Sequence, residues 1–307
     1  MTTSDDTTTV RAGHRTVTVH RPGKVLFPDC GITKADVAGY YRRVSAFMVP
    51  QLRDRPLMLE RRPDGTEGPR FMQKDTPAHY PEWVRRERVA KEGGTVTHTV
   101  CDNSATLVFL ADQACLTFHR WLSRAGRVDR PDRLVFDLDP PGDGFPAVRE
   151  AAHRLGELLD QLRLPSTLMT TGSKGLHVIV PLDGNTTFDD SRAFAKEVAD
   201  TLAERHPDAL TTAVRKQSRG DRLYLDVQRN AYAQTAVAPW SVRPEEGAPV
   251  AAPLSWEQLD DKEVTARSWT LTDTDGVLEQ ARTNPWADVS SRGRALGPAR
   301  RRLRALR

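Results

Sequence analysis

The second half of the sequence alternates short apolar runs with amphipathic stretches, and this alternation limits the folds that the chain can adopt. Four short runs predict strands: LVFDLDP, STLMT, GLHVIVPL and RLYLDVQ. Apolar residues recur at helical spacing in residues 145–162 and from about residue 189 to residue 205. The order strand, helix, hairpin, helix, strand predicts an α/β (α+β) sandwich, close to a ferredoxin-like or RNA-recognition-type arrangement. No G-x-G-x-x-G or G-x-x-x-x-G-K-[ST] loop is present, so neither a Rossmann nor a P-loop domain is predicted.

The first half contains one strongly predicted helix, from about residue 34 to residue 48. Thr33 is placed as its N-cap and Asp36 as the partner in a capping box. Apolar side chains then follow at helical spacing. Residues 62–82 are rich in Pro and Gly, and they predict loops with a short strand at residues 70–73.

Composition restricts the class of protein. The chain has 307 residues, of which 38% are hydrophobic and 28% charged, as expected for a folded protein of two modest domains or one domain with two lobes. We expect no transmembrane helix, no membrane partner and no secretory signal, and therefore a cytoplasmic protein. The three cysteines include no C-x-x-C pair, which argues against a disulfide framework and against a Cys-rich zinc site.

Charge is distributed unevenly along the chain. The net charge is +4, but residues 292–307 carry seven Arg and no acid, so the remainder of the chain is slightly negative. Basic residues exceed acidic ones in residues 1–100, whereas acids predominate in residues 101–291. A basic front lobe beside an acidic region suits a polyanion held near carboxylates that need cations, although a solvated surface could give the same pattern by chance.

Two predicted strands carry carboxylates in an otherwise apolar setting. Asp137 and Asp139 alternate with Phe136 and Leu138, so both acids should project from one face of the strand. Asp226 lies in similar surroundings in a second strand. Three carboxylates from two strands could hold two divalent cations, the arrangement used for in-line phosphoryl or nucleotidyl transfer. The alternative is that these are solvated acids at strand ends.

The segment TGSKGLH between these strands is a candidate anion site. Its two glycines allow a close turn with exposed N–H groups, and Ser173, Lys174 and His177 could bind a triphosphate. Arg219 lies in a basic stretch just before Asp226. A β-turn with a polar tip, a half-buried histidine and a solvated basic loop are the alternatives.

These motifs resemble a known family over roughly residues 20–290. Six stretches are similar, in order and spacing, to the polymerase domain of bacterial ligase D, in the archaeo-eukaryotic primase superfamily: HRPGKVLFPDCGITKADVAGYY, RPLMLERRPDG, LVFDLDP, TTGSKGLHVIVPL, LYLDVQRNAYAQTAVAPWSVR and APVAAPLSWEQL. The resemblance implies a primase-polymerase fold of two packed lobes, with an RNA-recognition-like catalytic sheet flanked by helices. We expect four parts: a flexible N-terminal segment (1–20), a DNA-end-binding lobe (21–125), the catalytic lobe (126–290) and an Arg-rich tail (291–307).

The resemblance also implies roles for individual residues. In that family the acids matching Asp137, Asp139 and Asp226 bind two catalytic ions, which implies two Mn²⁺ or Mg²⁺ ions here. The family's contacts to the incoming NTP or dNTP match His119, Ser173, Lys174, His177, Arg219 and Arg243.

DNA contacts are implied in the same way. The lysines that bind a DNA 5′-phosphate in the family match Lys24 and Lys34, and Lys34 falls in the first turn of the predicted helix, where free N–H groups favour an anion. Phe71 matches an aromatic residue that stacks on the template, but Met72 stands where the family often has a second aromatic. Arg21 and Glu245 also depart from the family, which has Asn and Arg at these positions.

The resemblance implies a ribonucleotide-preferring, template-dependent polymerase that fills gaps and extends DNA ends in non-homologous end joining. Its expected partners are DNA with 5′-phosphorylated gaps or double-strand-break ends, a Ku-type protein and a separate DNA ligase, in a bacterial, nucleoid-associated setting. The alternatives are a primase that makes primers de novo and a noncatalytic DNA-end-binding module. A further alternative places the main nucleic-acid contact in residues 292–307.

Overall fold

The chain passes more than once between two units of structure. The computed structural model describes residues 6–142, 144–287, 289 and 292–306. Unit 1 comprises residues 1–121, 237–251 and 269–282, and unit 2 comprises residues 122–236, 252–268 and 283–307. Within the described ranges, no helix is long and apolar enough to cross a membrane.

Unit 2 is built on a six-stranded sheet in the order β15-β16-β12-β14-β13-β18. Its strands are β12 (Arg133–Asp139), β13 (Thr167–Thr170), β14 (Leu176–Pro181), β15 (Leu210–Thr211), β16 (Leu223–Asp226) and β18 (Pro253–Leu254). The four predicted strands occupy the centre in the order β16-β12-β14-β13, and all their pairings are antiparallel. The predicted mixed α/β arrangement is therefore confirmed.

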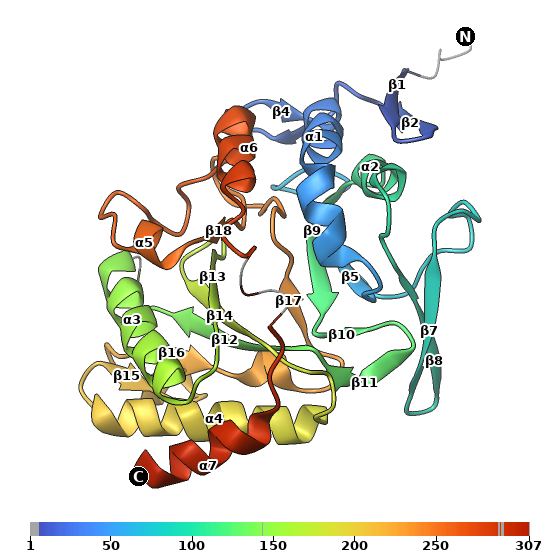
Figure 1. Cartoon of the computed structure of the whole chain (residues 1–307). Helices are drawn as coiled ribbons and strands as arrows, with labels where there is room; N and C mark the ends of the chain where they lie inside the picture. The colour runs from blue at the N-terminus through green and yellow to red at the C-terminus, as the bar shows by residue number, and fades with distance from the viewer. Residues whose placement is uncertain (1–5, 143, 288, 290–291, 307) are drawn as a thin grey trace. The chain divides into compact units, whose positions relative to one another are not determined.

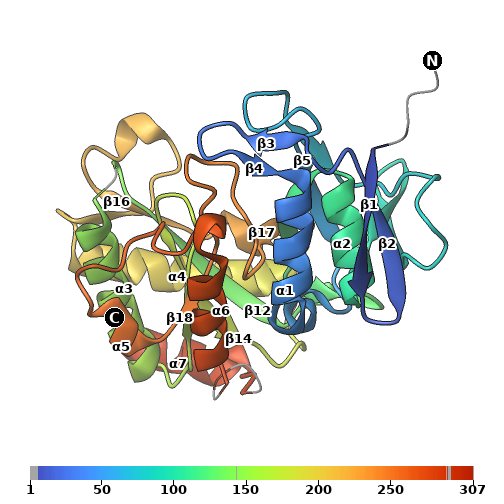
Figure 2. The same ribbon diagram turned by 90° about the horizontal axis from the view of Figure 1, so that it is seen from above.

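Apolar residues on one face of this sheet pack against two helices. Leu134, Phe136 and Leu138 of β12 are buried, and β12 contacts both α3 (Phe145–Gln161) and α4 (Phe188–Arg205). Figures 1 and 2 show these helices along the sheet. Because side chains alternate along a strand, Asp137 and Asp139 project from the opposite face.

The rest of unit 2 surrounds this core. Its further strands, short helices and C-terminal helix are β10 (Ser123–Arg124), β11 (Arg127–Pro131), η1 (Lys216–Ser218), η2 (Gln228–Asn230), α5 (Trp256–Leu259) and α7 (Leu296–Leu306). The segment around α5 is fixed to α3 by Arg149, which donates hydrogen bonds to the carbonyls of Leu259, Asp261 and Val264.

The predicted front helix is α1 of unit 1, and it runs from Lys34 to Leu52. Thr33 and Asp36 form the predicted capping box. Helix α1 contacts α2 (Ser104–Asp112) and the hairpin of β1 (Thr7–Ala12) with β2 (Arg15–His20). The unit also contains η3 (Leu271–Asp273), α6 (Thr274–Thr283) and the hairpins of β3 (Val25–Phe27) with β4 (Ile32–Thr33) and of β7 (Arg86–Lys91) with β8 (Gly94–Thr99). The sheet of unit 1 contains β5 (Leu57–Arg61), β6 (Phe71–Gln73) and β9 (Cys115–Trp121), in the order β9-β5-β6, and β17 (Thr235–Val237) joins β9 where the chain enters the unit.

Buried polar side chains hold residues 237–251 in unit 1. The Tyr40 hydroxyl donates a 2.8 Å hydrogen bond to the Trp240 carbonyl. The Ser241 hydroxyl accepts the Phe118 N–H at 2.7 Å, and the Thr117 hydroxyl donates to the Val242 carbonyl at 2.8 Å. Because unmade hydrogen bonds are costly in a protein interior, these pairs fix the segment there.

The observed division differs from the expected linear one at three places. Residues 237–251 and 269–282 belong to unit 1 instead of the catalytic lobe. Residues 7–20, expected within a flexible segment, form the β1–β2 hairpin, which buries Val17 and Val19. The expected Arg-rich tail forms α7, which contacts α4.

Helix α7 packs by its apolar side and also uses some of its arginines within unit 2. Leu296, Ala299 and Leu303 are buried. Arg300 donates to the Asp190 carbonyl, and Arg302 donates to the Leu162 carbonyl. The arginine run is thus partly a structural element of the fold.

We predict that Leu303→Ala lowers the free energy of unfolding by about 2–3 kcal/mol, because it leaves a cavity under α7. The matched control is Leu306→Ala, because Leu306 is exposed, and its effect should stay within about 0.5 kcal/mol. Urea unfolding followed by circular dichroism measures both changes. Equal effects of the two substitutions would contradict the packing of α7.

Candidate active site

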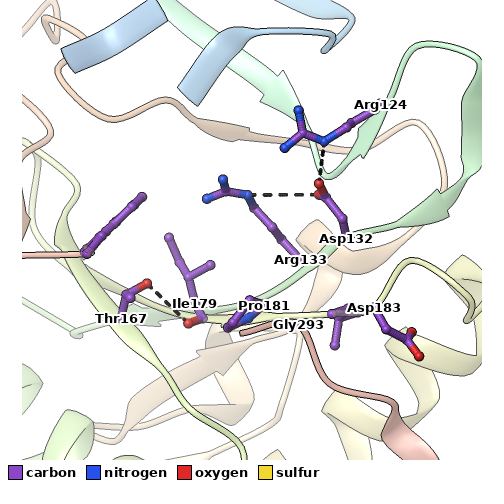
Figure 3. A pocket seen from close by; sticks show the side chains of 10 residues that line it. Arg124, Asp132, Arg133, Thr167, Ile179, Pro181, Asp183 and Gly293 are labelled. Carbon is purple, nitrogen blue, oxygen red and sulfur yellow. Dashed lines mark hydrogen bonds and ion pairs between the residues drawn. The ribbon is translucent and has the colours of Figure 1, made fainter. Parts of the chain in front are cut away.

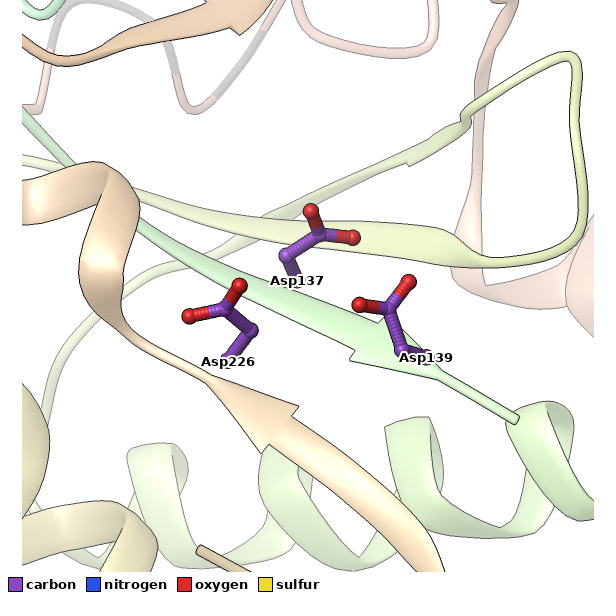
Figure 4. Close-up of side chains that lie close together, drawn as sticks. All are labelled: Asp137, Asp139 and Asp226. Atoms are coloured by element: carbon purple, nitrogen blue, oxygen red, sulfur yellow. The ribbon is translucent and has the colours of Figure 1, made fainter. Parts of the chain in front are cut away.

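The register of β12 and β16 brings three carboxylates together in unit 2. Asp137 lies directly opposite Asp226 on the neighbouring strand, and Asp139 is two residues further along the same face of β12. One oxygen from each of the three side chains lies within 4.8 Å of the others, and Figure 4 shows the three carboxylates converging on one space. Residues separated by about 90 positions in the sequence thus form one acidic cluster.

The three acids lie in different electrostatic surroundings. Burial acts to raise the pKa of Asp137, but the charges of His177 and Arg229 outweigh it and lower this pKa to about 2. Burial, with the negative charges of Asp137 and Asp226, raises the pKa of Asp139 to about 7. A metal-free cluster therefore resists full ionisation near neutral pH.

This donor set fits a divalent cation that prefers oxygen ligands. Carboxylate oxygens at this spacing suit Mg²⁺, Mn²⁺ or Ca²⁺. A cation would also remove the repulsion that holds the pKa of Asp139 high. Asp137, Asp139 and Asp226 are therefore the residues that could hold a metal ion.

His177 lies beside the acidic cluster on the next strand of the sheet. It lies on β14 opposite Asp137, and its Nε2 atom is 3.4 Å from Asp137 Oδ1. His177 is only 2% exposed. The structure therefore places it beside the carboxylates and inside the core of unit 2.

The turn before β14 is held by the Thr171 side chain. The Thr171 hydroxyl accepts the N–H groups of Ser173 and Gly175 and donates to the Gly175 carbonyl. Gly172 adopts a positive φ of 66°, and a Cβ atom on Gly175 would lie 2.2 Å from the Leu138 carbonyl oxygen. The two glycines are thus needed for different reasons, one for conformation and one for close approach to β12.

A basic pocket of about 390 Å³ lies beside the acids in unit 2. Asp139 lines it together with Pro140, Pro141, Lys174, Lys216, Arg219, Gly220 and Arg222. Four of these side chains are cationic, so the pocket could accommodate a polyanion. A polyanion bound there could also share metal ions with the neighbouring carboxylates.

The basic loop that forms one wall of this pocket is braced by its own arginines. Arg219 donates hydrogen bonds to the carbonyls of Ala213 and Val214. Arg222 donates to the carbonyls of Ser218 and Arg219. These contacts hold both guanidinium groups close to the backbone of residues 213–219.

A second pocket, of about 330 Å³, lies near the other end of β12. Figure 3 shows Arg124 and Arg133 on its wall, where both contact the Asp132 carboxylate, at 2.8 and 4.0 Å. The acids of the cluster do not line this pocket. The carboxylates and the basic pocket therefore lie together at the Asp139 end of the strand.

Several residues that shape the site are not among those predicted from the sequence. The Asn230 side chain accepts the Val135 N–H at 2.8 Å and donates to the Val135 carbonyl at 2.7 Å, so it continues the hydrogen bonding of β12 beyond the end of β16. Arg229 reaches Asp137 Oδ2 at 3.4 Å. Thr171 organises the turn described above. Their only sequence signal is that they adjoin the acidic and glycine motifs.

In unit 1 the β3–β4 hairpin brings the two predicted phosphate-binding lysines together. The Lys34 N–H donates to the Lys24 carbonyl at 2.8 Å. The Lys24 ammonium lies 2.8 Å from Asp64, and the Lys34 ammonium lies 3.5 Å from Asp112, whose carboxylate is buried. Lys34 begins α1, as predicted, and is itself buried.

The remaining predicted residues are also in unit 1. Phe71, on β6, is 51% exposed, as a stacking residue requires, and Met72 is 37% exposed. His119 lies on β9 with Nε2 3.9 Å from Glu60, and the Arg243 N–H donates to the Pro249 carbonyl. His119 and Arg243 belong to unit 1, whereas the three carboxylates belong to unit 2. Contact of His119 and Arg243 with the nucleotide therefore stays a prediction.

The sheet of unit 2 and the groups that it presents are typical of one class of enzyme. A sheet whose central strands present three carboxylates beside a cationic pocket has the parts needed for metal-dependent transfer of a nucleotidyl group. The sequence model of the LigD primase-polymerase domain matches residues 33–286. The chain belongs to this family, whose members are nucleotidyltransferases, and the predicted resemblance is confirmed.

Individual relatives support the same assignment. The multifunctional non-homologous end joining protein LigD of Mycolicibacterium smegmatis is 34% identical over 252 residues, covering 81% of this chain and 33% of that protein. The bifunctional LigD of Bacillus subtilis is 31% identical over 259 residues, covering 84% and 42%. The polymerase domain of Mycobacterium tuberculosis ligase D in complex with DNA matches with a TM-score of 0.83 and 31% identity, covering 90% and 99%. The chain thus spans about a third of the length of the mycobacterial LigD protein.

We predict that Asp139→Asn raises the melting temperature of the metal-free protein at pH 8 by about 3 °C. The pKa of Asp139 is about 7 in the folded protein and about 3.9 in an unfolded chain, so ionisation of this residue destabilises the fold as pH rises through 7. Mn²⁺ should raise the melting temperature of the wild type at pH 8 but much less at pH 6, where protons compete for Asp139.

Differential scanning fluorimetry with and without Mn²⁺ measures these shifts. Asp129→Asn serves as the control, because Asp129 is an exposed acid of the same unit. The interpretation fails if Asp139→Asn melts below the wild type in the absence of metal, or if it gains as much stability from Mn²⁺ as the wild type does.

Proposed function

We propose that this chain is a template-dependent DNA-directed polymerase that prefers ribonucleotides and that fills gaps and extends DNA ends during non-homologous end joining. The observation that carries the proposal is the convergence of three carboxylates beside a pocket with four cationic side chains. The names of the relatives, as end-joining proteins and as a polymerase domain in complex with DNA, support the biological setting.

The carboxylates and the basic pocket divide the chemistry between them. Asp137, Asp139 and Asp226 would hold two Mn²⁺ or Mg²⁺ ions, and the bound ions would lower the pKa of a primer 3′-hydroxyl and offset charge on the leaving pyrophosphate. Lys174 and Arg219 line the pocket in which the triphosphate would be oriented.

Other residues would complete the nucleotide site. Ser173 lies on the turn that Thr171 holds, and its hydroxyl would contact the triphosphate. His177 supports Asp137 from β14 and would bind the nucleotide. His119 and Arg243 of unit 1 would contact the same nucleotide, as the resemblance to the family implies.

The DNA end would bind to unit 1. Lys24 and Lys34 adjoin each other at the start of α1, where the helix N-terminus adds to their attraction for a 5′-phosphate. The exposed Phe71 would stack on a template base. A Ku-type protein and a ligase on a separate chain would then complete end joining.

Extension of a 5′-phosphorylated gapped duplex tests the function directly. Ribo- and deoxyribonucleotides are each supplied with Mn²⁺ or Mg²⁺, and we expect templated addition with a preference for ribonucleotides. Synthesis of dinucleotides on unprimed single strands would instead favour a primase. Absence of extension with every metal and nucleotide would leave an end-binding module.

We predict that the double substitution Asp137→Ala and Asp139→Ala abolishes nucleotide incorporation but preserves binding to 5′-phosphorylated gapped DNA. The reason is that the substitutions remove metal ligands of unit 2 and leave the lysines of unit 1 in place. Primer extension and fluorescence anisotropy measure the two properties, with Asp129→Ala as the control. Synthesis by the double variant would refute the metal assignment.

We predict that the double substitution Lys24→Ala and Lys34→Ala reduces the preference for a 5′-phosphate roughly tenfold, because charge-assisted hydrogen bonds to the phosphate are lost. Binding to gapped DNA with and without the phosphate is compared by anisotropy at fixed salt. The exposed Lys196 of α4 provides the control Lys196→Ala. An unchanged preference in a variant with a normal melting curve would move the phosphate site elsewhere.

A further inference from the structure

Tyr224 occupies a position in unit 2 that links the carboxylates to the basic pocket. It lies on β16 directly opposite Asp139, and it shares a face of the strand with Asp226, two residues further on. Its side chain is almost wholly buried. The proposed chemistry assigns this residue no part.

The Tyr224 ring supports the guanidinium group of Arg219. The Arg219 Cζ atom lies 3.7 Å from the centre of the ring, which is a close cation–π contact. The guanidinium group also donates to the carbonyls of Ala213 and Val214, at 3.0 and 2.8 Å. The ring and these two carbonyls therefore limit the positions that Arg219 can take at the wall of the pocket.

The hydroxyl group at the other end of the same side chain contacts a predicted metal ligand. It donates to Asp226 Oδ1 at 3.3 Å, and this oxygen also accepts the Gln228 N–H at 2.7 Å. Two donors on one oxygen oppose rotation of the carboxylate. The other oxygen, Oδ2, is then the better placed of the two to bind a cation.

We propose that Tyr224 is a positioning residue that couples the metal site to the triphosphate site, because one rigid side chain orients both Asp226 and Arg219. The inference rests on the proposed function, in which Asp226 holds a cation and Arg219 contacts the triphosphate. A residue that only filled the core would need neither the hydroxyl group nor the stacked arginine. The two ends of Tyr224 can therefore be tested separately.

Two substitutions separate the contributions of the ring and the hydroxyl group. Tyr224→Phe removes the hydrogen bond to Asp226 but keeps the surface on which Arg219 stacks. Tyr224→Leu removes both. Tyr232→Phe is the matched control, because Tyr232 is an exposed tyrosine of the same unit that packs against Phe188.

Binding is measured by isothermal titration calorimetry with two probes, Mn²⁺ alone and inorganic tripolyphosphate alone. For Tyr224→Phe we expect Mn²⁺ affinity to fall about fivefold, as for loss of one ordinary hydrogen bond, and tripolyphosphate affinity to stay within twofold. For Tyr224→Leu we expect Mn²⁺ affinity to fall at least as far and tripolyphosphate affinity to fall about fivefold. The control should match the wild type for both probes.

A double-mutant cycle shows whether the ring acts through Arg219. In an Arg219→Ala background, Tyr224→Leu should no longer change tripolyphosphate affinity. The proposal is overturned if the full effect of Tyr224→Leu persists in that background, or if Tyr224→Phe binds Mn²⁺ as tightly as the wild type does.

The outcome can be distinguished from failure of the proposed function. Both probes bind without DNA and without catalysis, so their dissociation constants report on Tyr224 even if the wild type extends no primer. Conversely, an active wild type with unaltered binding by the Tyr224 variants would retain the polymerase proposal and discard the coupling.

Discussion

Repulsion among three carboxylates is the constraint around which unit 2 is organised. The pairing of β12 with β16 places Asp137 opposite Asp226, and the ladder of backbone hydrogen bonds keeps these side chains close despite their charge. Apolar residues on the reverse face of β12 bury the strand against helices and so stabilise this register. The pKa of Asp139, raised to about 7, records the electrostatic cost that a bound cation would relieve.

The elements proposed to bind the triphosphate depend on the same strand. Gly175 brings the turn so close to β12 that any side chain there would overlap the Leu138 carbonyl, immediately before Asp139. On the other side, the Tyr224 ring stacks on Arg219 while its hydroxyl group contacts Asp226. The proposed metal ligands and the proposed phosphate-binding groups therefore share supports, and a change in one should affect the other.

Buried hydrogen bonds between residues far apart in the sequence stabilise the interleaved arrangement of the two units along the chain. Tyr40 and Thr117 bond to backbone carbonyls of residues 237–251, which places this segment in unit 1 although it follows the strands of the unit 2 sheet that carry the three carboxylates. Local patterns contain no information about such distant partners, so the linear division into lobes could not anticipate it. The role of the Arg-rich C-terminal segment could not be predicted for a similar reason. Only the packing of α7 against α4 shows that some of these arginines stabilise the fold.

Local sequence patterns were enough to predict the main strands and helices and the residue types of the site. Alternation placed the acids on one face of each strand, helical spacing predicted α1, α3 and α4, and the glycine-bounded turn marked a candidate anion site. The folded chain was needed to show that Asp226 pairs with Asp137, that Asn230 and Arg229 support β12, and that Tyr224 contacts both Arg219 and Asp226. The physical reason is that periodicity reports which face a side chain occupies, whereas strand register and side-chain contacts depend on the packing of the whole unit.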